Sequence, residues 1–362
     1  MALGSKLQKT NSVLFFCFLL IVGLYYGSSF LIPLTFGIFF TTLILPISDL
    51  FEKKLKFGRI LSSFISTFIL FLVVGGLFFL LFRQFSLFVN DLLERKEDVL
   101  GFVENLREQI VHLTGITLEQ QEEVFKDKIF GMIQELQKHL SSLLNNFVDI
   151  LMSFLLMLIY VFLFLIYRDQ FFNFFMRYVS STNKSGAETI IKKSKNVANR
   201  YLWGRVQVMI VLAIMYTITF IAYDLEYSAL LIIFGVLVTI IPYIGPFVSG
   251  LLPILFMIVF SDNSTEIISF AVIVLVIQLI ESYVLEPIII GSEVKQSPLF
   301  VIIAVVLGGL IWGFAGLVLF VPLFGVMKII FDNTAGLEPI GLLIGYNSDK
   351  PSEGDKKDEK IE

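Results

Sequence analysis

Two carboxylates stand at the end of an apolar stretch of the chain, where a charged side chain is costly. Gln278, Glu281 and Ser282 fall within one helical turn, and Glu286 follows shortly after them. Carboxylates inside membrane segments usually face the protein interior, a cavity or a partner. Because a buried glutamate is able to exchange a proton or hold a cation, we expect Glu281 and Glu286 to couple ion movement. Alternatively, both lie at the membrane interface and pair with Lys295 or another base.

A second candidate element is the apolar run 228–260, which is interrupted in its middle by two prolines and a glycine. Each arm has only about 14 residues, whereas a membrane helix needs ~20. Non-helical backbone at membrane depth is tolerated only where protein buries it or water lines it. The run therefore predicts a re-entrant hairpin or broken helix of a transport pathway, with a simple kink as the alternative. The residues predicted to line this pathway here are Pro242, Tyr243, Gly245 and Pro246.

The apolar run 299–331 is interrupted by glycines instead of prolines. Gly308, Gly309, Gly313 and Gly316 allow unusual dihedral angles and close backbone approach. If both runs are re-entrant, they enter from opposite sides and form an inverted repeat with a site between their tips. We therefore add Gly309 and Gly313, with Gln278 and Ser282, to the predicted pathway. Two alternatives remain: the glycines serve helix packing, or the arms are short full spans.

Polar and aromatic residues precede the apolar run that starts near residue 206. Tyr201 and Trp203 suit an anchor at the membrane interface, and Arg200 could pair with an inner carboxylate. Asn199, Arg200 and Tyr201 are therefore predicted to form either an anchor or a gate.

Composition places the whole chain in the membrane class. It is 56% hydrophobic and only 16% charged, with 39 Phe. No basic patch suggests a nucleic-acid partner. One cysteine, Cys17, and two histidines, His112 and His139, make a metal site or disulfide framework improbable. No nucleophile–base arrangement and no phosphate-binding glycine loop is recognised, so we expect no enzyme activity and no cofactor.

Basic residues give the expected orientation. About six segments read as full membrane helices, because they are apolar over nearly the length that a bilayer requires: 12–28, 29–48, 60–82, 147–167, 206–223 and 266–285. Lysines and arginines cluster after the second and fourth of these, which places both loops and both termini in the cytoplasm.

The sequence thus predicts an all-α polytopic membrane protein with two broken or re-entrant hairpins and an outer insert. Its expected parts are membrane helices in 1–82, an extracytoplasmic helical hairpin in 83–146, a fourth helix in 147–167, a basic cytoplasmic loop in 168–205, a transport core in 206–331 and a cytoplasmic tail in 332–362. In the insert, Thr117 and Gln120 form a capping box that opens a helix. Its apolar faces pack on each other or on a neighbouring subunit.

Several motifs in this order resemble the autoinducer-2 exporter (AI-2E) family of bacterial membrane proteins. They are Arg200-Tyr201-Leu202-x-Gly204, Ile241-Pro242-Tyr243-Ile244-Gly245-Pro246, Gln278-Leu279-Ile280-Glu281, Leu285-Glu286-Pro287, Gly291, Pro298-Leu299, Gly313-Phe314-Ala315-Gly316 and Val321-Pro322-Leu323. The resemblance implies a homo-oligomeric permease of the bacterial inner membrane that exports autoinducer-2, a quorum-sensing signal, or a related small solute. Some members resemble sodium or lithium/proton antiporters instead.

Three functions are therefore weighed from the sequence. The first is secondary transport of a small polar solute out of the cell, and the second is cation/proton antiport with Glu281 as the exchanging carboxylate. The third is a channel or membrane scaffold without coupled transport. The expected partners are the lipid bilayer, the solute or cation, and further copies of the chain, with a pentamer as the expected oligomer.

Overall fold

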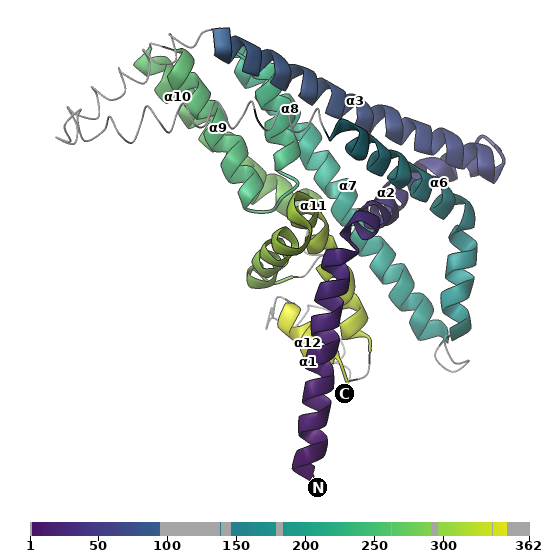
Figure 1. The fold of residues 1–362 in the computed structure, drawn as a ribbon. Coiled ribbons are helices and arrows are strands. Elements are labelled where there is room, and N and C mark those ends of the chain that lie inside the picture. The colour runs from purple at the N-terminus through teal and green to yellow at the C-terminus, as the bar shows by residue number, and fades with distance from the viewer. Residues whose placement is uncertain are drawn as a thin grey trace, which may run out of the picture. The chain divides into compact units, whose positions relative to one another are not determined.

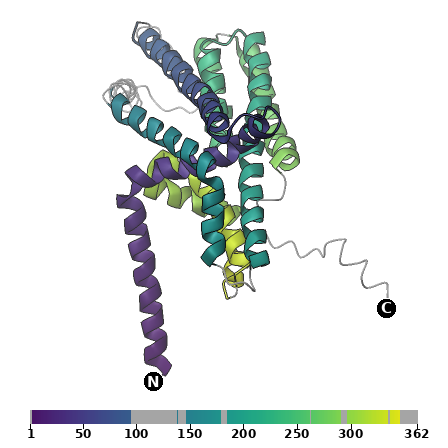
Figure 2. The same cartoon turned by 90° about the vertical axis from the view of Figure 1, so that its right-hand side faces the viewer.

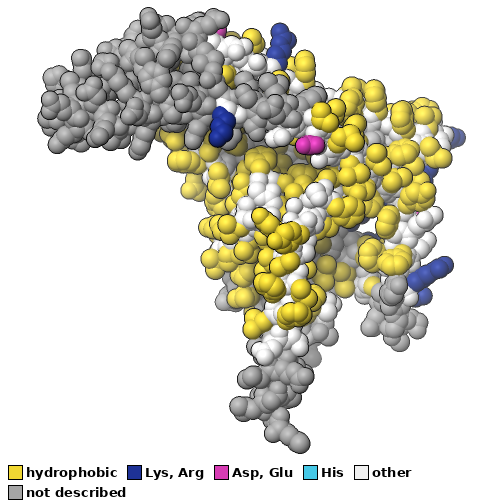
Figure 3. Space-filling view, viewed as in Figure 1, with side chains coloured by type: hydrophobic (Ala, Val, Ile, Leu, Met, Phe, Trp, Pro, Cys, Tyr) yellow, Lys and Arg dark blue, Asp and Glu magenta, His cyan; other side chains and the backbone are white. Residues whose placement is uncertain are grey.

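The computed structural model describes residues 2–94, 138, 146–178, 184–261, 263–290, 296–334 and 336–345. Within these ranges the chain is helical and no strand is present (Figure 1). Apolar side chains cover much of the described surface in Figure 3. Exposed aromatic residues of the chain include Phe64, Phe68, Phe78 and Phe79. Exposed apolar side chains at this density suit a lipid environment. The predicted all-α polytopic membrane fold is therefore confirmed.

Among the described residues, six helices are long and apolar enough, by length and composition, to cross a membrane. They are α2 (Ser28–Lys53), α3 (Arg59–Glu94), α6 (Phe147–Tyr178), α7 (Lys184–Ala222), α10 (Ser264–Ile280) continued by the π-helix η2 (Glu281–Ile290), and α11 (Pro298–Asp332). The set differs from the predicted one, because it includes α11 and leaves out α1 (Ala2–Tyr26), whose described apolar part is the shorter Leu14–Tyr26. Figure 2 shows α1 as one rod that runs to the N-terminus.

The chain divides into two compact units. Unit 1 comprises Met1–Ser63, Ile159–Gln207 and Leu285–Glu362, and unit 2 comprises Phe64–Leu158 and Val208–Val284.

Unit 2 contains the first broken segment, and the break falls where the prolines predict it. Helix α8 (Ser228–Val238) ends before the turn, and α9 (Ile244–Phe260) begins after it (Figure 1). Tyr243 takes a positive φ of 65° in the turn. A Cβ on Gly245 would lie closer than 3.0 Å to the backbone of α8, so only glycine fits there. With 11 and 17 residues, neither arm reaches the ~20 of a full span.

An aromatic core joins α7 to α10 in unit 2. Tyr216 and Phe220 stack with ring centroids 4.9 Å apart, and Phe220 packs on Phe270 at 5.6 Å. All three side chains are fully buried. Since rings at 4.5–7 Å attract one another beyond their burial, this core holds the α7–α10 pair in a defined register.

Unit 1 contains the second broken segment, inside α11. Trp312 and Gly313 leave the helical region there, and Gly313 has φ 56° and ψ −137°, a conformation that favours glycine. Beyond this turn the arms touch backbone to backbone: a Cβ on Gly308 or on Gly316 would lie closer than 3.0 Å to the other's carbonyl group. The indole N–H of Trp312 donates to the carbonyl oxygen of Leu24 in the last turn of α1, at 2.9 Å.

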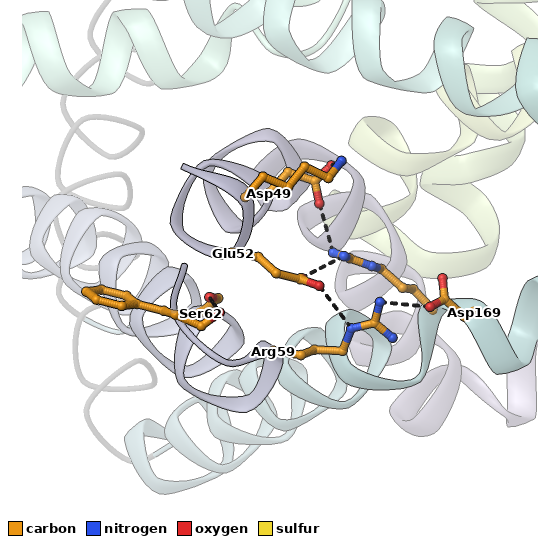
Figure 4. A network of polar contacts seen from close by, with 8 residues as sticks. Asp49, Glu52, Arg59, Ser62 and Asp169 are labelled. Carbon is orange, nitrogen blue, oxygen red and sulfur yellow. Dashed lines mark hydrogen bonds and ion pairs between the residues drawn. The ribbon is translucent and has the colours of Figure 1, made fainter. Parts of the chain in front are cut away.

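Charged residues from three helices meet in unit 1 (Figure 4). Arg168 of α6 pairs with Glu52 at 2.7 Å and with Asp49 at 3.0 Å, both near the end of α2. Arg59, at the start of α3, pairs with Asp169 at 2.7 Å and reaches Glu52 at 3.5 Å. We call these five residues the charge network. It ties the ends of α2 and α6 to the start of α3.

Several helices extend beyond their predicted bounds. The segment 168–205, expected as a loop, is helical at 168–178 and 184–205. Its many lysine and arginine residues are good helix formers, so their charge does not oppose a helix. Helix α3 runs to Glu94, past its predicted end at 82. The sixth helix continues as η2 to Ile290.

A short helix follows α11 in the segment predicted as the cytoplasmic tail. The tail from 332 contains α12 (Glu338–Ile344), which packs on α11; a Cβ on Gly341 would meet Asp332 there. Most of the outer insert, with Thr117 and Gln120, lies outside the described residues.

Candidate transport site

Four polar side chains of unit 2 converge beside the break between α8 and α9. They are Tyr216 of α7, Ser249 of α9, Gln278 of α10 and Glu281 at the start of η2, and we call them the Gln278 cluster. The phenol of Tyr216 donates to the carbonyl oxygen of Ser249 at 3.0 Å and contacts the Gln278 amide. The cluster thus links three helices to one arm of the hairpin.

The Gln278 amide sits at the centre of this cluster. Donors face acceptors around it when its nitrogen donates to the Pro246 carbonyl oxygen at 3.0 Å and to Glu281 Oε2 at 3.1 Å. Its oxygen then accepts from the Ser249 hydroxyl at 3.1 Å and lies against the Tyr216 hydroxyl, whose proton is shared with the Ser249 carbonyl oxygen. Because an amide carries both donors and acceptors, Gln278 connects the carboxylate to the hairpin backbone.

Small residues allow this close approach. A Cβ on Gly250 would lie 2.9 Å from the side chain of Gln278, so α9 and α10 pack at this distance only with glycine there. A Cβ on Gly235 would lie 3.5 Å from Ser249 and 3.6 Å from Tyr216, an ordinary van der Waals distance, so Gly250 is the position where the side-chain volume matters. The sequence therefore brings polar atoms together by removing side-chain volume next to them.

Glu281 is the most unusual member of the cluster, since its side chain is 0% exposed. It begins the ten-residue π-helix η2, which contains Pro287. π-Helical turns occur frequently at functional sites, and a buried carboxylate in a membrane helix is costly unless it has a use. With the Ser249 hydroxyl and the Pro246 carbonyl nearby, the cluster offers oxygen atoms that suit a proton, a solute hydroxyl or a hard cation.

The predicted pathway residues of unit 2 are only partly brought together. Gln278, Glu281 and Pro246 meet as described. Pro242 and Gly245 are buried in the turn, whereas Tyr243 is 54% exposed. Ser282 is exposed and lies outside the cluster, although it follows Glu281 directly. The functional roles of these residues stay predictions.

In unit 1, Glu286 is paired with Arg205 of α7. The pairing agrees with the alternative prediction that Glu286 pairs with Lys295 or another base. The sequence had assigned Arg205 only to the basic loop. The guanidinium also lies over the ring of Tyr201, 5.8 Å from its centroid. Tyr201 is buried, Asn199 is half-buried and Arg200 is exposed. The spacing of four between Tyr201 and Arg205 was the signal available in the sequence.

The two pathway glycines predicted in α11 also belong to unit 1. Gly313 forms the turn, with nothing near its missing side chain. Gly309 packs against the side chain of Leu317, as the helix-packing alternative expects. Trp203, predicted as an interface anchor, donates its indole N–H to the carbonyl oxygen of Leu43 in α2 at 3.0 Å.

Two members of the Gln278 cluster, Tyr216 and Ser249, were not foreseen from the sequence. Both occur in apolar helices with no motif around them; the Ser249-Gly250 pair after the break was the only available hint. Among the described residues, no group of three or more His, Cys, Asp or Glu is placed to hold a metal ion.

Comparison with known proteins agrees with this architecture. The sequence profile described as AI-2E family transporter matches residues 14–336. The chain is 24% identical over 306 residues to the Bacillus subtilis protein named "Putative transport protein YrrI", covering 82% of this chain and 84% of YrrI. YueF of Bacillus subtilis, with the same form of name, is 24% identical over 81% of this chain and 80% of its own. YhhT of Escherichia coli K12 is 26% identical over 33% of this chain and 34% of its own. The chain therefore belongs to the AI-2E transporter family and is a multi-pass membrane transporter.

Proposed function

We propose that this protein moves a small polar solute out of the cell by secondary transport, using the Gln278 cluster as its site. The observation that carries the proposal is the fully buried Glu281, which Gln278 joins to the Pro246 carbonyl of the broken α8–α9 segment. Broken membrane helices commonly form the substrate and coupling sites of secondary transporters. A carboxylate in that position suits coupling of solute movement to a proton.

The family name suggests the solute class. Autoinducer-2, or a related small hydroxylated molecule, presents hydroxyl groups that donate and accept hydrogen bonds. The cluster has matching groups in the Tyr216 and Ser249 hydroxyls, the Gln278 amide and the Glu281 carboxylate. Such a site binds an uncharged polar solute by exchanging its internal hydrogen bonds for bonds to the solute.

Sodium or lithium/proton antiport is the second candidate. It is favoured by the same carboxylate together with the Pro246 carbonyl and the Ser249 hydroxyl, since oxygen atoms are the ligands that hard cations prefer. In this case Glu281 alternates between a proton and the cation. A channel or scaffold without coupling is the remaining alternative.

The proposed setting is the inner membrane of a bacterium with both termini in the cytoplasm. The charge network supports this orientation, because the basic residues Arg59 and Arg168, from the two predicted cytoplasmic segments, meet at one place within unit 1 (Figure 4). Lysine and arginine are enriched on the cytoplasmic side. Homo-oligomerisation, with five copies as the expected number, remains part of the proposal.

Flux in proteoliposomes tests these functions. The wild type and Glu281→Gln are compared for uptake of isotopically labelled autoinducer-2 under an imposed proton gradient, and for proton movement under a sodium or lithium gradient. Glu266→Gln is the matched control, since Glu266 is on the same helix and contacts Ser261 outside the cluster.

Saturable autoinducer-2 flux that loses its proton dependence in Glu281→Gln alone supports the exporter. Cation-driven proton movement lost in the same variant supports the antiporter. Unitary conductance without saturation supports a channel. Coupling that survives unchanged in Glu281→Gln contradicts the role assigned to this carboxylate.

A further inference from the structure

The base of the α8–α9 hairpin in unit 2 is closed by an aromatic side chain. Tyr227 directly precedes α8, and its ring centroid lies 5.6 Å from that of Phe260, the last residue of α9. The ring of Phe256, one turn earlier in α9, lies 6.3 Å away. The two ends of the hairpin therefore meet, opposite the turn that contributes Pro246 to the Gln278 cluster.

Helix α3 reaches this base with two side chains. The Tyr227 hydroxyl donates a hydrogen bond to Oδ2 of Asp91 at 2.8 Å. One turn earlier in α3, the ring of Phe88 lies 5.1 Å from that of Tyr227 and 5.3 Å from that of Phe256. Because hydrogen bonds to a carboxylate are stronger than neutral ones, Asp91 is the main polar attachment of α3 to the hairpin base.

The backbone at Tyr227 is in an unfavourable conformation. Its φ of 55° and ψ of 25° lie in the left-handed region, which is costly for a residue with a Cβ. Its carbonyl oxygen accepts from the N–H of Leu231 at 3.0 Å, so this conformation starts the first turn of α8. Such strain persists only where surrounding contacts hold the residue, and it favours separation once they break.

The joint between α3 and the hairpin is also the more accessible of two joints in unit 2. Phe88, Asp91 and Tyr227 are half-buried, whereas the aromatic core that joins α7 to α10 is fully buried. Contacts with partial solvent exposure open at a lower free energy than core contacts. Since alternating access moves one helical element against another around a fixed site, the α3 joint is the place where the hairpin separates first.

We propose that Asp91 and Tyr227 form a latch, which holds the hairpin by its base and opens during transport. The inference rests on the proposed transport at the Gln278 cluster and adds the step that frees the hairpin. Opening breaks the Asp91–Tyr227 hydrogen bond, separates Phe88 from the hairpin rings and lets α8 and α9 move as one unit. Asp91 is a positioning residue, since it acts on the solute only through Tyr227 and the hairpin.

Hydrogen exchange of backbone amides measures this opening without any solute. Tyr227→Phe removes the hydroxyl and keeps the ring, so we expect the amides of α8 to exchange about five- to tenfold faster, the loss of one hydrogen bond. Asp91→Ala removes the acceptor and should have the same effect, whereas Asp91→Asn keeps an acceptor oxygen and should retain most of the protection.

Tyr223→Phe is the matched control for the exchange measurement. Tyr223 precedes α8 in the same link, but its hydroxyl donates to Ser269 of α10 at 3.0 Å. Its loss should leave the exchange of the α8 amides unchanged.

A reducible cross-link tests whether transport needs the opening. Cys17→Ser removes the only cysteine, and Asp91→Cys with Tyr227→Cys then supplies two thiols at the latch. A bifunctional methanethiosulfonate reagent joins them across the space of the phenol. Compared with the same protein before joining, we expect autoinducer-2 flux to be lost and to return on reduction. Joining Tyr223→Cys to Ser269→Cys in the same way leaves the hairpin base untied and should leave flux unchanged.

Faster exchange in Tyr227→Phe, together with a reversible loss of flux in the joined protein, supports the latch. Unchanged exchange in Tyr227→Phe, or full flux in the joined protein, overturns it, and saturable flux then leaves the transport proposal standing. If the wild type moves neither autoinducer-2 nor a cation, the transport proposal fails, and the exchange result alone decides whether the latch exists.

Discussion

The phenol of Tyr216 and the amide of Gln278 are in hydrogen-bond contact, although 62 residues separate them in sequence. Through Ser249 and Pro246 the same two side chains reach α9, at the break between α8 and α9. The contact therefore joins two helices of unit 2 to the segment whose irregular backbone marks a transport site. A change at Tyr216 is expected to affect packing and transport together.

Tyr216→Phe removes the hydroxyl and keeps the aromatic core with Phe220. The Ser249 carbonyl oxygen and the Gln278 amide lose a buried partner, so we expect the free energy of unfolding to fall by about 1–3 kcal/mol. Solute flux is expected to fall as well, since the amide loses its orientation. Thermal unfolding in detergent and proteoliposome flux measure the two effects.

Tyr167→Phe is the control for this prediction, because that residue of α6 is 44% exposed. Its unfolding midpoint and flux should match the wild type. If Tyr216→Phe and Tyr167→Phe have the same unfolding midpoint and the same flux, the Tyr216 hydroxyl contributes to neither stability nor transport.

Gly308→Ala and Gly316→Ala test the second broken segment. In either variant the new methyl group would overlap a backbone carbonyl of the opposite arm, which is unable to move aside as a side chain can. We expect a destabilisation near the upper end for overpacking, about 3 kcal/mol. The measurement is the midpoint of thermal unfolding, with the yield of folded protein as a second reading.

Gly76→Ala provides the matched control, since nothing lies within 4 Å of the position of its Cβ in α3. Alanine is favoured over glycine by roughly 0.5–1 kcal/mol inside a helix, so this variant should be neutral or slightly stabilised. If Gly308→Ala unfolds at the same temperature as Gly76→Ala, the arms of α11 are not in backbone contact.

Arg168→Gln tests the charge network of unit 1. The side chain is 20% exposed and pairs with two carboxylates, Glu52 and Asp49. Its loss leaves these like charges without their shared partner, and we expect a destabilisation of about 1–3 kcal/mol, smaller than for a fully buried pair. Thermal unfolding at low and high salt checks this, because salt screens the remaining repulsion.

Lys53→Gln serves as the comparison for Arg168. Its side chain is 70% exposed and forms an i,i+4 pair with Asp49 at 2.8 Å, the kind of contact worth at most ~0.5 kcal/mol. The network interpretation is wrong if both variants lose the same stability.

Trp312→Phe and Trp203→Phe each remove one indole donor to a backbone carbonyl oxygen. Leu24, the acceptor for Trp312, lies in the last turn of α1, where carbonyl groups lack a helical donor. Leu43, the acceptor for Trp203, lies inside α2, where Ile47, four residues later, keeps a backbone N–H for this carbonyl group. We therefore expect Trp312→Phe to cost about 1 kcal/mol or more and Trp203→Phe less. The midpoints of thermal unfolding test this, and Trp312→Phe should have the lower one. A lower midpoint for Trp203→Phe would contradict the capping role of Trp312.

Local chemistry was enough to predict much of this protein. Long apolar runs specify membrane helices, because a bilayer offers the backbone no hydrogen-bond partner. Two prolines and Gly245 place the first break, and the glycines around Gly313 place the second, since these residues change the dihedral angles of their own positions. A carboxylate in an apolar run similarly marks Glu281 as a residue that needs an interior environment.

Partner choice was decided only by tertiary structure. Glu286 pairs with Arg205, 81 residues away, and Gln278 meets Tyr216 and Ser249 from two other helices. Helical periodicity reports which face a residue occupies, and it does not report which distant face is packed against it. The extent of α7 also escaped the sequence reading, because packing and helix propensity extend it back to Lys184 without any apolar signal. Contacts between distant helices depend on how the whole chain packs, so the site's composition becomes visible only in the fold.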